Sequence, residues 1–89
     1  MRIKLYHTEV LNMVISDIYE AGDNKAEIKR LLSKLVNHYF EYTVTPRERQ
    51  IQMNLLFIDV SNSLADDKER QNICREILKS ILLGILIPK

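Results

Sequence analysis

Apolar residues recur along the first part of the chain at the spacing of one face of an α-helix. This spacing of i, i+3, i+4 and i+7 predicts a helix from about Thr8. Gly22 stands where such a helix ends, because glycine adopts the left-handed conformation without a Cβ clash. The apolar face comprises Leu11, Val14, Ile15 and Ile18.

A second helix is predicted from the next polar residues. Asn24 precedes Glu27 by three positions, the spacing of a capping box in which two side chains satisfy free backbone N–H groups. We expect this helix to end near Thr43, because Pro46 keeps the residue before it out of the α region. Its stripe comprises Ile28, Leu31, Leu32, Leu35 and Tyr39, widened by Val36, Phe40 and Tyr42.

The segment Thr45-Pro46-Arg47-Glu48 has the strongest local signal in the chain. A threonine N-cap, a proline at the first helical position and a glutamate two residues later predict a third helix from Pro46. Apolar residues between Ile51 and Leu64 cover more than half of its circumference, so we expect the other helices to surround it. Residues 55–58 also fit a buried strand, but no second strand is predicted to pair with them.

A fourth helix is predicted after Asp66 and Asp67, which supply caps and negative charge at its start. It should run to about Leu83 and stop at Gly84. Its apolar stripe comprises Ile73, Ile77, Leu78, Ile81 and Leu82. Its solvated side comprises Arg70, Arg75, Glu76 and Lys79.

Four helices with short connections predict an all-α fold in a single domain, residues 1–89. An up-and-down four-helix bundle is the default arrangement for such connections. A helical-hairpin dimer, in which the helices splay to pair with a second copy, is the alternative. Small domains leave much of their surface exposed, and apolar residues on several helix faces favour association.

Composition narrows the class of protein further. Hydrophobic residues make up 46% and charged residues 28% of the 89, a globular balance that excludes a disordered or collagen-like chain. The single cysteine excludes an internal disulfide and indicates a reducing, cytoplasmic setting. His7, Thr8 and Glu9 interrupt the apolar run that a signal peptide needs, and residues 77–87 are too short to span a membrane.

The chain has no recognisable catalytic or metal-binding motif, so we expect neither an enzyme nor a cofactor. His7 and His38 have no histidine or cysteine three or four residues away, and we expect both at the surface. Cys74 lies on an apolar helix face, where a free cysteine behaves as a small hydrophobe. The acidic clusters at residues 17–23 and 66–69 fit helix ends and caps better than acid–base catalysis.

Nucleic acid is a possible partner, because four cations recur at helical spacing on the second helix. The net charge of +1 and the acidic Glu27 and Glu41 on that helix count against such binding. The candidate contacts are Lys25, Lys29, Arg30 and Lys34.

Residues 10–36, and less clearly the chain up to Leu56, resemble the YmgB/AriR family of biofilm-development and two-component connector proteins. The resemblance implies a short bacterial all-α protein that dimerises through paired helices, has no catalytic residues and regulates stress or biofilm responses. The segment after Asp59 has no counterpart in that pattern. The matching residues are Leu11, Val14, Ile15, Asp17, Ile18, Gly22, Asn24, Leu31, Leu32, Lys34 and Leu35.

The leading hypothesis is a small non-catalytic helical regulator that acts by protein–protein interaction as a homodimer and on an unidentified partner protein. The alternatives are an immunity protein or phage-type inhibitor of a toxin or host enzyme, and a DNA-binding transcriptional regulator. We expect the protein contacts on the apolar C-terminal face of the fourth helix. They are Ile77, Ile81, Leu82, Leu83 and Ile85.

Overall fold

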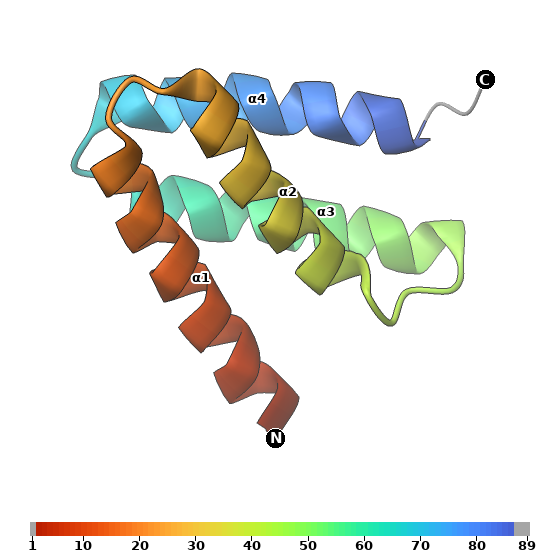
Figure 1. Ribbon diagram of the computed structural model, residues 1–89. Helices are drawn as coiled ribbons and strands as arrows, with labels where there is room; N and C mark the ends of the chain where they lie inside the picture. Colours follow the sequence, from red (N-terminus) through yellow and green to blue (C-terminus); the bar gives the residue numbers. More distant parts are fainter. Residues whose placement is uncertain (1, 87–89) are drawn as a thin grey trace.

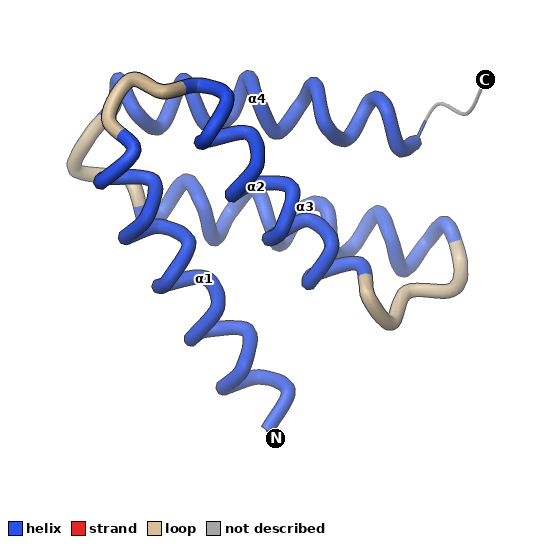
Figure 2. The backbone as a smooth tube through the Cα atoms, viewed as in Figure 1, coloured by secondary structure: helices blue, strands red, loops and turns tan. Residues whose placement is uncertain are grey.

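The computed structural model describes the backbone of residues 2–86 and the side-chain surroundings of residues 8–84. The described chain forms four α-helices and no strand, which confirms the all-α fold (Figure 2). The helices are α1 (Arg2–Ala21), α2 (Lys25–Phe40), α3 (Pro46–Ser63) and α4 (Lys68–Leu86).

The four helices form two antiparallel hairpins that cross each other in two layers (Figure 1). The α1–α2 hairpin lies across the α3–α4 hairpin, and the molecule measures 36 × 35 × 18 Å. A thickness of 18 Å corresponds to two layers of helices, each about 10 Å wide. The arrangement is a flat four-helix bundle with two broad outer faces.

Both α2 and α3 pack against each of the other three helices. The expectation that several helices contact α3 is therefore confirmed, but α2 contributes more side chains to the core. Six side chains of α2 are buried, whereas α3 contributes Leu56 and Val60 and leaves its opposite side open. A wide apolar circumference on α3 therefore does not mean that other helices of this chain cover it.

The hydrophobic core lies between the two layers and receives side chains from all four helices. Ile18 of α1, Leu32 of α2, Leu56 of α3 and Leu78 of α4 are each fully buried. No charged side chain is buried among the described residues. The other members of the core are Val14, Ile15, Ile28, Leu31, Leu35, Val36, Tyr39, Val60, Leu64, Cys74 and Leu82.

The helix ends confirm most of the capping predictions. The Asn24 side chain accepts a hydrogen bond from the N–H of Glu27, and Thr45 and Glu48 form a complete capping box at the start of α3. Gly22 has φ +62°, the left-handed conformation expected after α1. Of the two aspartates before α4, it is Asp67 that accepts from the first turn, through the N–H of Arg70 at 3.1 Å.

Three predicted helix boundaries are wrong. The first helix begins at Arg2 instead of near Thr8, since no glycine or proline interrupts the preceding residues. The second ends at Phe40, three residues before the predicted end. The fourth continues through Gly84 to Leu86, because one glycine costs an α-helix only about 1 kcal/mol and does not by itself end it.

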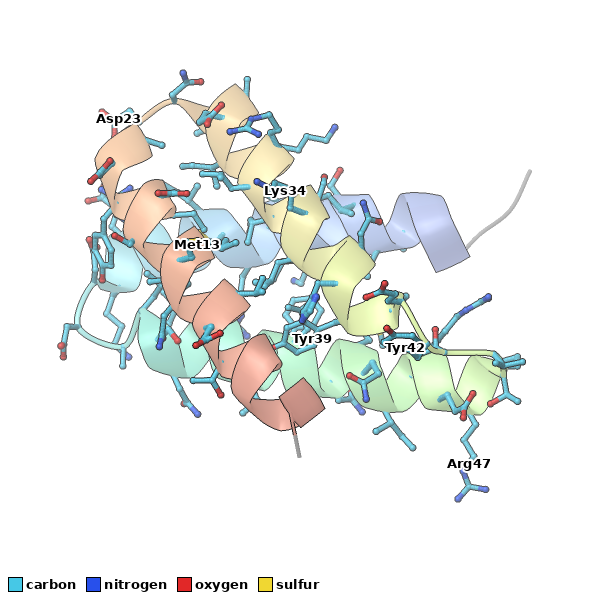
Figure 3. All side chains as sticks on the ribbon, turned by 60° about the horizontal axis from the view of Figure 1, so that its bottom comes forward. Met13, Asp23, Lys34, Tyr39, Tyr42 and Arg47 are labelled. Carbon is cyan, nitrogen blue, oxygen red and sulfur yellow. The ribbon has the colours of Figure 1, made fainter. Side chains whose placement is uncertain are left out.

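Two polar side chains join the layers of the fold. Tyr39, labelled in Figure 3, lies at the junction of the layers. Its hydroxyl donates a hydrogen bond to Asp59 at 2.6 Å, which connects α2 with α3. Arg70 of α4 donates to the carbonyls of Ile18 and Gly22 at the end of α1. Arg70 was expected on the solvated side of its helix, but these carbonyl acceptors hold it half-buried between the layers.

Candidate protein-interaction surface

One face of α3 carries large apolar side chains that no other part of the described chain covers. Ile51, Leu55 and Ile58 recur at i, i+4 and i+7, so they form one row along two turns of the helix. Their exposed fractions are 55%, 43% and 55%, whereas Leu56 and Val60 on the opposite side are fully buried. We call this row the α3 stripe.

The fully exposed charges near the α3 stripe lie at its two ends. Asp59, one turn after Leu55, is half-buried and accepts the hydrogen bond from Tyr39. The uncharged Asn54 is exposed beside the middle of the stripe, and Asn62 follows one turn after Ile58. Arg47 projects away from the molecule in the first turn of α3 (Figure 3), and Asp66 is exposed just beyond the last turn. The stripe is therefore an apolar strip with Arg47 and the capping Glu48 near one end and Asp66 beyond the other.

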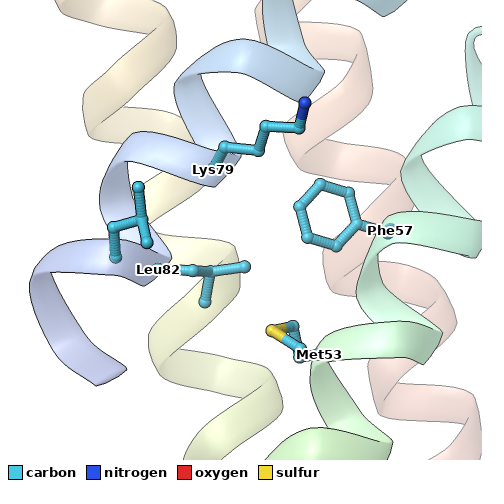
Figure 4. Close-up of a pocket in the computed structure, with 5 residues that line it drawn as sticks. Met53, Phe57, Lys79 and Leu82 are labelled. Atoms are coloured by element: carbon cyan, nitrogen blue, oxygen red, sulfur yellow. The ribbon is translucent and has the colours of Figure 1, made fainter. Parts of the chain in front are cut away.

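A groove runs between α3 and α4 on the face turned away from α1 and α2. It consists of two hollows of about 240 and 430 Å³ that share Phe57 and Lys79. Met53 and Phe57 project into it from α3, and Lys79 and Leu82 line it from α4 (Figure 4). Leu83 completes the apolar hollow, and Ile58, Ser61, Asn62 and Arg75 line the other. We call this feature the α3–α4 groove.

The charged side chains that line the α3–α4 groove are both cations. Arg75 has no ion pair among the described residues, and Lys79 approaches Glu76 at 3.6 Å, with both of those side chains more than half exposed. An exposed pair at this distance holds its partners weakly. Both cations are therefore available to an acidic ligand at one end of an apolar groove.

The predicted contact residues of α4 do not form one exposed face. Leu82 belongs to the core, and Ile77 and Ile81 are half-buried against it, because α4 turns this side toward the rest of the bundle. Leu83 is 58% exposed and lines the α3–α4 groove. Ile85 lies in α4, but its side chain is outside the described residues.

The predicted nucleic-acid contacts lie on the outer face of α2, beside an acidic strip on α1. Lys25, Lys29 and Lys34 are exposed, and Arg30 is paired with Glu27, whose hydrogen bond raises the pKa of Arg30. Four acidic residues and no lysine or arginine occur between positions 8 and 24, and Asp23 lies at the end of α1 near this face (Figure 3). These neighbouring carboxylates oppose the approach of a phosphate backbone to the cations.

The titratable side chains inside the fold have structural surroundings. Burial raises the pKa of the Cys74 thiol to about 11, which keeps it protonated and unreactive near neutral pH. His38 is half-buried beside Tyr39 with its ring edge-on to the phenol, which corrects the expected surface position, whereas His7 is outside the described side chains. Among the described residues, no three His, Cys, Asp or Glu side chains lie close enough together to hold a metal ion.

The sequence does not distinguish the α3 stripe and the α3–α4 groove as separate surfaces. The signal for the stripe is present, since the apolar residues of α3 exceed those that one core face requires. The groove depends on how α3 and α4 pack, so Phe57 and Lys79 have no signature in the sequence. Tyr42 was expected to border the core, but it is 73% exposed because α2 ends before it.

No family model, curated protein or solved structure matches this chain. Within the described residues, no helix is both long enough and apolar enough to cross a lipid bilayer.

Proposed function

We propose that this protein is a small non-catalytic regulator that acts by protein–protein contact, and that it does so as a homodimer joined through the α3 stripe. The observation that carries the proposal is the row of Ile51, Leu55 and Ile58, exposed to water on a helix that has its own buried face. Rows of large apolar side chains in water mark interaction sites. The resemblance of residues 10–36 to the YmgB/AriR proteins supports a regulatory role.

A second copy of the chain suits the α3 stripe because the stripe is complementary to itself. In an antiparallel pair of α3 helices about a two-fold axis, Leu55 faces the partner's Ile58 and Ile51 faces the partner's Asn62. The same register brings Arg47 toward the partner's turn after α3, which carries Asp66. Apolar contacts thus meet in the middle, and opposite charges meet at both ends.

The helix dipole favours the same antiparallel arrangement. Arg47 lies in the first turn of α3, where the positive end of the dipole disfavours a cation. In the antiparallel pair, this unfavourable charge receives an opposite charge from the partner. The net charge of only +1 leaves little long-range repulsion between two copies.

The proposal is tested by light scattering of the whole chain across a range of concentrations. We expect the mass of a dimer, and we expect Leu55→Asp combined with Ile58→Asp to give a folded monomer. Met13→Asp is the matched control, because Met13 is 60% exposed on α1 in the other layer. A wild-type protein that stays monomeric at every concentration, or a dimer that survives both substitutions, contradicts the proposal.

A charge exchange tests the register independently of the apolar contacts. Arg47→Glu and Asp66→Arg should each weaken the dimer, and the double variant should restore it, because the pair is then reversed in sign. A monomeric wild type would instead favour the alternative of an immunity protein or inhibitor with a different partner. Binding to duplex DNA that falls steeply with salt would support the third alternative.

A further inference from the structure

We propose that the α3–α4 groove binds an amphipathic helix of a partner protein that has acidic side chains beside its apolar face. The inference deepens the proposed function, since it names the kind of partner that a regulatory protein of this class would contact. It rests on the shape of the groove, its apolar lining and its cations.

The shape of the groove suits a helix. The two hollows join at Phe57 and Lys79, and along α3 they extend from Met53 to Asn62. The nine residue steps from Met53 to Asn62 rise about 13.5 Å along the helix, so the groove accommodates more than two turns of a second helix. The groove lies open on the surface, whereas small-molecule sites enclose most of the ligand. A partner helix covers an open groove of this length better than a small amphiphile does.

The end of the groove at Met53 provides the apolar contacts. Met53, Leu82 and Leu83 line the hollow here, and the Phe57 ring forms the wall toward the other end. Methionine and phenylalanine in such a groove accept aliphatic anchors from a helix at i, i+4 and i+7. This end therefore requires a partner segment with an apolar face.

The other end of the groove determines the charge of the partner. Arg75 and Lys79 lie one turn apart on α4, and among the described residues no carboxylate lines the groove. Glu76, the acidic neighbour on α4, holds Lys79 only through the exposed contact at 3.6 Å. Two acidic side chains on the partner helix would lie against these two cations. The attraction favours the encounter of the two proteins, and repulsion from the same cations disfavours binding of a basic helix.

The groove and the α3 stripe share Ile58, and Asn62 at the end of the stripe also lines the groove. The apolar hollow lies on another side of α3, because at 100° per residue Phe57 points about 120° away from Ile51. Phe57 belongs only to the groove and Leu55 only to the stripe, so substitutions at these two residues test the partner helix and the dimer separately.

The experiment selects binders to the whole chain from a displayed library of 16-residue helical peptides in which apolar and charged positions are randomised. We expect the selected peptides to carry Asp or Glu, not Lys or Arg, beside an apolar face. Their affinity should fall at least tenfold for Arg75→Glu combined with Lys79→Glu, and also for Phe57→Ala. Lys29→Glu combined with Lys34→Glu is the matched control, because it makes the same change of charge on the outer face of α2 and should leave the affinity unchanged.

Three outcomes would overturn the inference: no peptide is selected, the selected peptides lack an acidic bias, or they bind the Arg75→Glu, Lys79→Glu variant as tightly as the wild type. Circular dichroism shows whether each variant is folded.

The molar mass of the same groove variants should remain that of the wild type. If acidic peptides bind but the wild type is monomeric, the proposed dimer fails and the partner site stands. If the dimer forms without peptide binding, only the partner site fails.

Discussion

The guanidinium of Arg70, in the first turn of α4, donates a hydrogen bond of 2.9 Å to the carbonyl of Gly22 at the end of α1. The same nitrogen lies 3.3 Å from the carbonyl of Ile18, and the guanidinium carbon lies 5.2 Å from the centre of the Tyr19 ring. The last carbonyls of a helix have no partner within the helix, and cations are favoured beside them. Arg70 thus caps α1 from another layer of the fold.

Replacing Arg70 should destabilise the fold through the loss of this cap. We expect Arg70→Ala to lower the free energy of unfolding by about 2 kcal/mol, because hydrogen bonds to a charged group contribute about 1.5–3 kcal/mol. Arg70→Lys should recover less than half of this loss, since an ammonium group lacks the planar fork that reaches Asp67 and Gly22 together. Urea unfolding measures both values, and Arg75→Ala on the exposed side of α4 is the control. Equal stability of all three variants would contradict the proposed cap.

Gly22 should resist substitution because of its backbone conformation and not for lack of space. An added Cβ would meet no atom within 4 Å, but φ is +62°. We expect Gly22→Ala to cost about 1 kcal/mol, and Gly22→Asn to cost less, because asparagine tolerates the left-handed region better. Gly84→Ala is the matched comparison and should stabilise α4, since this glycine lies inside a helix. Thermal unfolding of the three variants distinguishes the two kinds of glycine.

The hydrogen bond from Tyr39 to Asp59 should couple α2 to α3. Burial is the larger cause, and the hydrogen bond to the Asp59 carboxylate the second cause, that raise the pKa of Tyr39 above its ordinary value. We expect Tyr39→Phe to cost about 1–2 kcal/mol, because it leaves a half-buried carboxylate without this donor. A double-mutant cycle with Asp59→Asn should give a coupling free energy of about 1 kcal/mol. Strict additivity of the two substitutions would show that the bond contributes nothing.

Cys74 should make stability fall at alkaline pH. Its pKa is raised to about 11, so the folded state favours the protonated thiol over the unfolded state. This contribution is complete below the unfolded pKa of about 9 and is lost as pH rises toward 11. Urea unfolding at pH 8 and pH 10.5 should show the decline, and Cys74→Ala should reduce it. The native thiol should react with a disulfide reagent at pH 8 at least a hundredfold more slowly than the unfolded thiol.

Local patterns in the sequence are sufficient to predict the helices and their caps. Asn24, Thr45 and Glu48 satisfy backbone groups within four residues of themselves, so their roles can be derived without knowledge of the packing. The end of α4 could not be derived in this way, because Gly84 is equally compatible with a helix interior and a helix end. The two glycines differ in backbone conformation, since Gly22 adopts φ +62° and Gly84 stays within the helix, although both have open surroundings.

The candidate surfaces required the tertiary structure. Arg70 lies one turn before the buried Cys74, about 140° around α4 from the exposed Arg75. Only the crossing of the layers brings the end of α1 within reach of Arg70. The apolar C-terminal face of α4 was the expected contact, yet Leu82 is buried and only Leu83 is largely exposed among its described members. Periodicity identifies which residues share a helix face but not what covers that face.

The sequence by itself determined that the chain is all-α with four helices, and it placed three helix caps at the correct residues. It also identified the apolar stripes that supply the core. All of these features depend on residues close together along one helix. The tertiary structure alone decided that α2 supplies the largest share of the core, that the hairpins cross as two layers, and that Ile51, Leu55 and Ile58 remain exposed. Apolar residues occur all around α3, so the sequence pattern does not indicate which side of this helix faces the core. The packing of the two layers determines which side is buried.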